Sequence, residues 1–349
     1  MNSTAKDIAK NLGISQATVS IVLNGKRGVS NTTREEVLAE AERLGISPKI
    51  KSDDVHKNIR YVIFMDEGLT VSETFFHSII LQGIEERAKG CGYNVLISYF
   101  NANEDWNAQI KTITNNVSGI ILLGTEVTSS HVQKAIQLRI DNLQVPIVMV
   151  DNAFSNINVD CVVQDNQYGA YIATKALFAH GAKDVGYLRS KSRIDNFDER
   201  ELGFRKARRV AGISPSIQPH IVNVGVASAT AYSDMCNWLD EGNKPCAAYF
   251  ADNDIIAVAA IRALKQHGYS IPADVAIIGF DDMPFCDIVE PTLSSIRVQK
   301  EQMGSEAMRI LDHKIHLKLS RQADEAAVRV TVANKLIERE SSRIFSSKH

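Results

Sequence analysis

Residues 15–25 read SQATVSIVLNG, a run of small, polar and β-branched side chains between Gly13 and Gly25. The amide of Gln16 can pair bidentately with adenine, and short neighbouring side chains let a backbone approach base edges. Nearby hydroxyl and amide groups suit phosphates, which set the register on a duplex. The run therefore predicts a helix that enters a groove of DNA, although a three-helix bundle for protein contact is the alternative. The candidate DNA contacts here are Thr4, Ser15, Gln16, Ala17, Thr18, Ser20, Ile21, Asn24, Ser30 and Thr33.

A second set of polar and aromatic residues lies at the ends of short apolar, strand-like runs or at the starts of helical runs. Ligands of open α/β sheets bind at the carboxyl ends of the strands. Carboxylate, amide and guanidinium groups beside aromatic rings suit a polyhydroxylated effector, because each can make paired hydrogen bonds to vicinal hydroxyls. Capping by Asp254, a surface ion pair of Arg200 and core packing of Phe76 are the structural alternatives. The candidate effector contacts are Asp66, Phe75, Phe76, Asp151, Asn196, Phe197, Arg200, Asn253, Asp254 and Asp281.

The motifs of several enzyme chemistries are missing from the sequence. It contains no G-x-x-x-x-G-K-[ST] loop, no H-E-x-x-H and no G-x-S-x-G. The five cysteines are widely spaced and form no C-x-x-C pair, which argues against a zinc cage or a disulfide framework and fits a reducing cytosol. We therefore expect no enzymatic activity, no metal and no cofactor.

Helix signals divide the first fifty residues into three short helices. Thr4 can cap the first helix, and Ser15 can cap a second that runs to about residue 24. The third, TTREEVLAEAERLG, offers Thr32 or Thr33 as the start of a capping box. A turn of a few residues joins the first two helices, as a helix-turn-helix requires. Val19, Val22 and Leu23 are expected to face the small core.

The remaining chain alternates apolar runs with helical stretches, which predicts an α/β protein with parallel sheets covered on both faces. So many strands would make one sheet unusually wide, so two Rossmann-like subdomains are expected. The strand-like runs are 61–65, 93–100, 119–124, 146–151, 161–165, 184–190, 247–251 and 274–282.

Charge is uneven along the 349 residues, whose net charge is −2. Residues 1–60 carry ten Lys and Arg against seven acids, or +3, which leaves −5 for the rest and suits a nucleic-acid-binding head. The N-terminus lacks the apolar segment of a signal peptide, and no run of about 18 apolar residues exists. A cytoplasmic, nucleoid-associated protein is therefore expected.

The run DIAKNLGISQATVSIVLNGKRGVSNTTREEVLAEAERLGISP resembles the DNA-binding head of the lactose-repressor (LacI/GalR) family. The resemblance implies a helix-turn-helix three-helix head and a periplasmic-binding-protein-like body of two Rossmann-like subdomains. The implied domains are the head (1–48), a hinge or linker (49–59), a first subdomain (60–161 with 292–320) and a second (162–291 with 321–340).

The same resemblance implies roles for individual residues. Gln16 and Ala17 would read bases in the major groove, and Ile21 would occupy a third reading position, where it cannot hydrogen-bond a guanine. The family's R-x-x-G-[FW] and G-F-D-D motifs place Arg200 and Asp281 in the ligand cleft.

The hinge is where the resemblance weakens. Ile46 replaces the usual aromatic residue, and Ser52 and Asp53 stand where Ala-Arg is expected. Val55 falls near the leucine that wedges open the minor groove, and it is a shorter wedge. Acids beside a minor groove oppose binding. Residues 49–58 are therefore either a hinge that folds on DNA or a flexible linker.

The family implies a homodimer on a palindromic double-stranded DNA operator, most often a repressor controlled by a small molecule between the subdomains. A sugar or sugar derivative is the expected effector. The alternatives are a nucleobase corepressor or a phosphocarrier protein. A solute-binding or sugar-processing protein is a remote alternative, because it would not carry the head.

Overall fold

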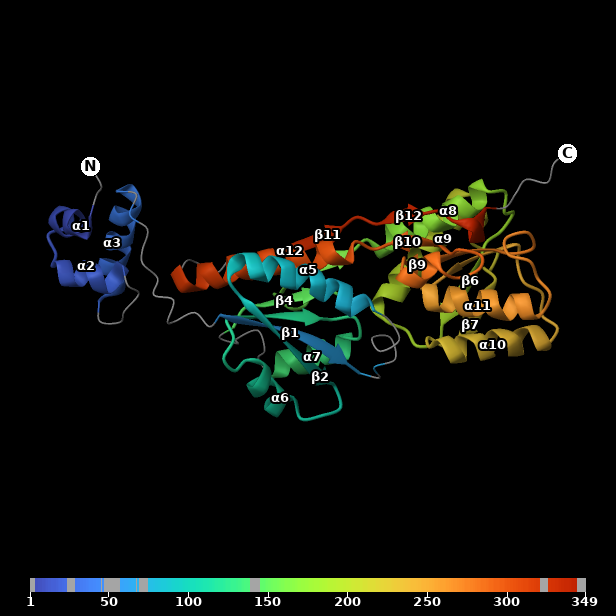
Figure 1. Cartoon of the computed structure of the whole chain (residues 1–349), viewed down its shortest axis with the longest axis horizontal. Coiled ribbons are helices and arrows are strands. Elements are labelled where there is room, and N and C mark those ends of the chain that lie inside the picture. The colour runs from blue at the N-terminus through green and yellow to red at the C-terminus, as the bar shows by residue number, and fades with distance from the viewer. Residues whose placement is uncertain are drawn as a thin grey trace. The chain divides into compact units, whose positions relative to one another are not determined.

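The computed structural model describes residues 4–23, 29–44, 46, 57–66, 68, 75–138, 145–320 and 326–343. The chain divides into two compact units, Met1–Lys57 and Asn58–His349 (Figure 1). The first unit holds the head, and the second is called the body below.

Three helices form the head: α1 (Ala5–Leu12), α2 (Gln16–Leu23) and α3 (Asn31–Arg43). Each helix contacts the other two. Val19 and Val22 of α2 are buried, as is Leu23, and they pack with Ile8 of α1 and Val37 of α3. The predicted inward face of the second helix is therefore confirmed, and its short polar residues are left on the outside.

Side-chain hydrogen bonds start the first two helices. The main-chain N–H and the hydroxyl of Thr4 donate to Asp7 over 2.7 and 2.9 Å, and Gly13 ends α1 in the left-handed conformation with φ 64°. The Oγ of Ser15 accepts the main-chain N–H of Thr18 over 3.0 Å. Both helix starts are thus encoded locally, as the sequence predicts.

The start of α3 differs from the prediction. The Oγ of Ser30 accepts the main-chain N–H of Thr33 over 3.2 Å, and the helix already begins at Asn31. The prediction that Thr32 or Thr33 caps this helix was wrong, because the hydroxyl that reaches the first free N–H groups lies at residue 30.

The first sheet of the body is entirely parallel, with the strand order β11-β5-β4-β3-β1-β2. Helices α5 and α12 pack against one face. Helices α6 and α7 cover the other, where Phe64, Phe100 and Trp106 form an aromatic cluster. The strands are β1 (Asn58–Met65), β2 (Asn94–Asn101), β3 (Gly119–Leu123), β4 (Ile147–Val150), β5 (Asp160–Gln164) and β11 (Arg329–Val332). The helices are α5 (Phe76–Cys91), α6 (Trp106–Ile113), α7 (Ser129–Gln137) and α12 (Lys300–Ser320).

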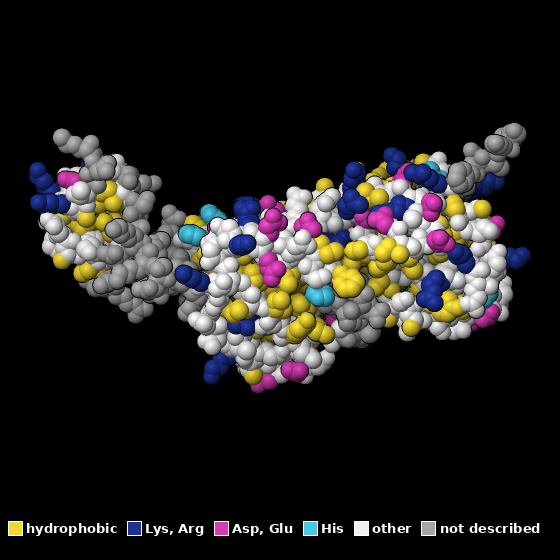
Figure 2. Space-filling view, viewed as in Figure 1, with side chains coloured by type: hydrophobic (Ala, Val, Ile, Leu, Met, Phe, Trp, Pro, Cys, Tyr) yellow, Lys and Arg dark blue, Asp and Glu magenta, His cyan; other side chains and the backbone are white. Residues whose placement is uncertain are grey.

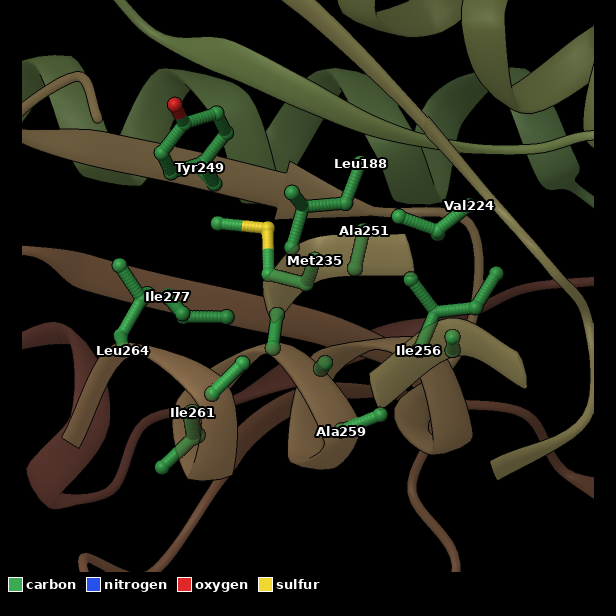
Figure 3. Packing of buried hydrophobic residues seen from close by; sticks show 14 of the residues in the cluster. Leu188, Val224, Met235, Tyr249, Ala251, Ile256, Ala259, Ile261, Leu264 and Ile277 are labelled. Carbon is green, nitrogen blue, oxygen red and sulfur yellow. The ribbon is translucent and has the colours of Figure 1, made fainter. Parts of the chain in front are cut away.

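The second sheet has the order β12-β10-β9-β8-β6-β7, and only the β12–β10 pair is antiparallel. Helices α8 and α9 cover one face, and α10 and α11 the other. Figure 3 shows Met235 among Leu188, Ala251 and Ile277 on the α10–α11 face. The strands are β6 (Gly186–Ser190), β7 (Ile221–Val224), β8 (Ala248–Ala251), β9 (Ala276–Asp281), β10 (Ser294–Arg297) and β12 (Lys335–Ile337). The helices are α8 (Asn166–Ala179), α9 (Asp195–Val210), α10 (Ser228–Asp240), α11 (Asp254–Gln266), and the 3₁₀ turns η2 (Pro284–Asp287) and η3 (Glu340–Ser342).

The chain passes between the two sheets after β5, after β10 and after β11. The expected boundaries put 292–320 in the first subdomain and 321–340 in the second. Instead, β10 pairs with β9 in the second sheet, and β11 pairs with β5 in the first. Both strands are short and partly polar, SSIR and RVTV, so the apolar pattern does not mark them. Among the helices described, none is long and apolar enough to cross a membrane.

Candidate DNA interface and ligand cavity

The outer face of α2 carries the residues predicted to read bases. Gln16, Ala17 and Ser20 are exposed, and Ile21 is half-buried. The neighbouring valines anchor the helix in the head, so the exposed positions stand on a rigid support. A slim face with one amide can approach base edges closely.

The remaining candidate DNA contacts cluster at helix starts. The hydroxyls of Ser15 and Thr18 lie 2.8 Å apart, and those of Ser30 and Thr33 are paired over the same distance. Free main-chain N–H groups at a helix start also attract phosphates. Thr4 has the same position on α1. Asn24 and Val55, which were also predicted to contact DNA, lie outside the described residues.

A polar cavity lies between the two sheets of the body, at the carboxyl ends of their strands. We call it the intersheet cavity. The space left for the centre of a water molecule is about 30 Å³, on the order of two waters. Its lining residues are Phe76, His77, Leu123, Thr125, Asp151, Gln164, Ile194, Asn196, Phe197, Arg200, Asn253 and Asp281.

Arg200 organises the wall that the second sheet contributes. Its Nε donates to Oδ1 of Asn166 over 2.9 Å, its Nη1 to the carbonyl of Asp252 over 2.5 Å, and its Nη2 to Oδ1 of Asp281 over 3.1 Å. The guanidinium also lies 3.7 Å from the centre of the Phe280 ring. The fixed fork of an arginine is therefore satisfied on three sides, which holds Asp281 in place.

Asp151 is the centre of the wall that the first sheet contributes. Its Oδ2 accepts the hydroxyl of Thr125 over 2.6 Å, and its Oδ1 accepts the amide Nε2 of Gln164 over 2.9 Å. Within the described part of the chain, the buried Oε1 of Gln164 has no hydrogen-bond partner. This wall thus presents an acceptor that a ligand hydroxyl can satisfy.

Asp151 and Asp281 share an unusual backbone and an unusual electrostatic setting. Their φ angles are 72° and 106°, in the left-handed region that side chains other than glycine rarely adopt. Burial raises the pKa of Asp151 to about 7, against the opposing effects of Thr125 and Arg200. Burial also raises the pKa of Asp281, while Arg200 and Lys300 oppose that rise. Strained residues with shifted pKa values are typical of binding sites.

The structure brings seven of the ten predicted effector residues to the intersheet cavity, and three are absent from its described lining. Asp66 points toward His131, with Oδ2 3.8 Å from Nε2. Phe75 is 68% exposed at the start of α5. Asp254 is buried, but it accepts hydrogen bonds from Ser295 and from the main chain of Met283. The structure does not bring these three side chains to the intersheet cavity, because a loop or helix start can turn its side chain away from the strand ends.

Five lining residues were not predicted. Thr125 and Gln164 follow or end strands, so their place at the carboxyl ends was the available signal. The other three lining residues that were not predicted are His77, Leu123 and Ile194. Asp252 was not predicted either. It is buried behind the lining, where it accepts the main-chain N–H of Ser190 over 2.7 Å. Across the described ranges, no three His, Cys, Asp or Glu side chains form a group that could hold a metal ion.

A helix-turn-helix head joined to a two-sheet body with an internal cavity is the architecture of a DNA-binding regulator. Residues 4–49 match bacterial regulatory proteins of the lacI family, and residues 174–342 match a periplasmic binding protein-like domain. The HTH-type transcriptional repressor PurR of Pasteurella multocida is 30% identical over 343 residues, which cover 96% of this chain and 100% of the relative. The chain belongs to the LacI family of bacterial regulatory proteins.

Solved structures share the fold over nearly the whole chain. A complex of the transcriptional regulator CelR with cellobiose has a TM-score of 0.70 at 24% identity, covering 97% of this chain and 99% of that one. A lac repressor dimer bound to its operator has a TM-score of 0.65 at 21% identity, covering 98% and 99%. The family match and the similarity to a transcriptional repressor show that the protein is a DNA-binding transcriptional regulator. Its relatives are regulators rather than enzymes.

Proposed function

We propose that the chain is a cytoplasmic repressor whose effector is a sugar or sugar derivative bound in the intersheet cavity. The observation that carries this proposal is the unpaired Oε1 of Gln164 beside the carboxylate of Asp151. Together with Asn196, Asn253 and Arg200, these groups offer adjacent donors and acceptors, which vicinal hydroxyls can satisfy in pairs.

Two aromatic side chains complement the polar groups. Phe76 from the first sheet's side and Phe197 from the second both line the cavity and are buried. Their rings suit the apolar face of a sugar ring, and equally a flat nucleobase. The nucleobase therefore remains the second candidate effector, and the two rings are the observation that favours it.

The size of the intersheet cavity implies a movement. A ring-shaped effector does not fit into the space of about 30 Å³ that the intersheet cavity leaves for water centres, since that space holds on the order of two waters. The walls come from different sheets, so they must separate for the effector to enter. Binding is then linked to the relative position of the two sheets, and the effector favours whichever arrangement it fits better.

We propose that two copies of the chain bind a palindromic operator, each with one head. Gln16, Ala17 and Ile21 would contact base edges, while the helix-start hydroxyls would contact phosphates. The operator complex of the lac repressor is a dimer. One head offers too small a surface for strong specificity, and two related by a two-fold axis read two half-sites.

Exposed apolar side chains on the body support this pairing. Figure 2 shows hydrophobic atoms gathered over the part of the body that contains α5. Phe75 before α5, and Ile97 and Tyr99 on the edge strand β2, are 68%, 48% and 62% exposed. Apolar patches of this kind mark protein interfaces. We propose that a second copy covers them.

A thermal-shift panel on the full-length chain tests the effector class. Sugars, sugar phosphates and nucleobases are compared at equal concentrations, and the phosphorylated phosphocarrier protein is tested separately. A ligand at one hundred times its dissociation constant stabilises the protein by about 2.7 kcal/mol. We expect a sugar to shift the melting temperature and to change operator affinity in the same titration. A nucleobase or the phosphocarrier acting alone would replace the sugar proposal.

A further inference from the structure

A second cavity lies inside the first sheet's core, on the face that α6 and α7 cover. It lies among β1, β2, β3, β4, these two helices and the segment before β5. The space left for the centre of a water molecule is about 80 Å³. We call this space the apolar cavity. It is separate from the intersheet cavity, because no residue in the described lining of one lines the other.

Of the fifteen described side chains that line the apolar cavity, fourteen are apolar. The exception is His131, whose Nδ1 accepts the main-chain N–H of Thr128 over 3.1 Å. The indole N–H of Trp106 donates to the carbonyl of Ala102 over 2.9 Å, so it does not serve the cavity. A buried water needs two to four polar partners. The described lining does not supply them, which favours an apolar occupant.

The uncharged state of the His131 side chain also favours an apolar occupant. His131 lies in the first turn of α7, and its ring centre is 4.9 Å from that of Phe64 on β1. Burial lowers the pKa of His131, while Asp66 opposes that effect. The uncharged imidazole then completes an aromatic wall with Phe64, Phe100 and Trp106.

Part of the wall of the apolar cavity lies close to the surface. Ile110 of α6, Leu122 of β3 and Ala135 of α7 line it and are only half-buried. Protein interiors are normally packed without voids larger than a water molecule, because an empty space forfeits dispersion contacts. A void of this size with half-buried walls can therefore gain those contacts from a ligand that enters from outside.

We propose that the apolar cavity is a second ligand site, which takes a small uncharged apolar molecule such as a short alkane or haloalkane. The size sets this class, since about 80 Å³ is roughly half of an apolar cavity that admits benzene. Leu122 faces the apolar cavity, and its neighbour Leu123 lines the intersheet cavity. A bound molecule would thus stiffen β3, which also supports the wall of the intersheet cavity. Only this effect on the intersheet cavity depends on the proposed function.

Xenon is the probe for the test, because it is small, apolar and unable to hydrogen-bond. The full-length chain is titrated with xenon and followed by ¹²⁹Xe NMR, which needs neither an operator nor an effector. We expect saturable binding. Ala135→Leu places extra carbons in the cavity and should abolish it. Ala108→Leu makes the same change at an exposed position of α6 and should leave it intact.

A second variant keeps the test decisive if Ala135→Leu folds poorly. Ile110→Ala enlarges the cavity, so the variant should bind benzene in a thermal-shift assay while the unchanged chain does not. Absence of saturable xenon binding in the unchanged chain overturns the proposal. So does xenon binding that survives in folded Ala135→Leu, or benzene that fails to stabilise Ile110→Ala.

Discussion

The outer face of α2 and the intersheet cavity present polar side chains in opposite ways. Gln16 and Ser20 are exposed on a helix whose apolar side packs into the head. Arg200 and Asp281 are buried, and each is fixed by hydrogen bonds from other elements. The face of α2 can adapt to a groove lined with water and phosphates, whereas the cavity is already organised before any ligand enters.

This difference determines what a substitution costs. Truncating an exposed side chain removes a contact with a partner molecule and leaves the fold unchanged. Truncating a buried charged group also strands the groups that it satisfied. Variants of the cavity are therefore expected to lose stability together with ligand response, and variants of the α2 face to lose only DNA recognition.

The largest effect is expected from Arg200→Ala. It leaves Asp281 as a buried carboxylate without its ion pair and frees the side-chain oxygen of Asn166. Breaking a buried pair in this way costs about 3–5 kcal/mol. We expect the melting temperature of the full-length chain to fall and the response to the effector to disappear.

Two further arginine variants serve as controls for the loss of stability in Arg200→Ala. Arg200→Lys keeps the charge but lacks the planar fork, so it should recover part of the stability. Arg205→Ala removes an exposed arginine of the same helix, which pairs with Glu201, and should cost under about 1 kcal/mol. Equal losses in Arg200→Ala and Arg205→Ala would contradict the role given to the buried network.

Gln16→Ala should change operator preference rather than stability. Loss of one bidentate amide contact removes about 1–3 kcal/mol of discrimination between bases. Operator variants that differ at single positions are compared by fluorescence anisotropy at fixed salt, since salt alone changes affinity. Gln302→Ala, an exposed glutamine of α12, is the control and should leave preference unchanged. A uniform loss across all operators would instead place Gln16 on a phosphate.

How much of the fold can be predicted from the sequence depends on whether an element is determined by neighbouring residues or by distant ones. The starts of α1 and α2 depend on hydrogen bonds that span three residues, so the cap residues mark them. Strongly apolar strands were also recognisable, while β7 (IVNV) and the short, partly polar β10 were missed. Local patterns therefore specify most elements, but not which sheet a short strand joins.

The residues of the intersheet cavity could be predicted only in part, for the same reason. Asp151 and Asp281 could be predicted, because parallel strands end at one edge of their sheet. One hydrogen-bond partner of Asp151 is Thr125, which lies 26 residues away in the chain, and no local pattern connects them. Neighbours at the start of α11 diverge as well: Asn253 lines the cavity, whereas Asp254 turns toward β10. Only the packed fold decides between two adjacent residues.

Buried Asp254 is expected to make the stability of the protein depend on pH, with a smaller effect than that of Arg200→Ala. Burial raises its pKa to about 7, so the folded protein holds a proton that the unfolded chain releases near its usual pKa. The stability contribution of this proton is present at low pH and is lost as pH rises toward and through 7.

Asp254→Asn should therefore gain stability relative to the unchanged chain between pH 5 and pH 8. An amide can still accept the main-chain N–H of Met283 and can donate to Ser295. We expect this gain to grow by about 2–3 kcal/mol between pH 5 and pH 8, because each pH unit below the raised pKa is equivalent to about 1.4 kcal/mol, and we measure it by thermal unfolding across the pH range. Asp151 titrates in both proteins, so the difference between them reports Asp254 together with its interaction with buried Asp281. A difference that does not vary with pH would contradict the assignment.

The smallest effect belongs to the helix starts of the head. Ser15→Ala removes the oxygen that accepts the main-chain N–H of Thr18, which costs about 0.5–1 kcal/mol of local stability. Faster hydrogen exchange of the α2 amides, measured without DNA, checks this. Thr18→Val keeps that N–H and loses only the hydroxyl, so its exchange should change less. If both variants exchange equally fast, then the contact between the two hydroxyls, rather than the cap, stabilises the start of α2. A phosphate contact by either hydroxyl would appear only in the salt dependence of operator binding, which separates DNA recognition from support of the helix.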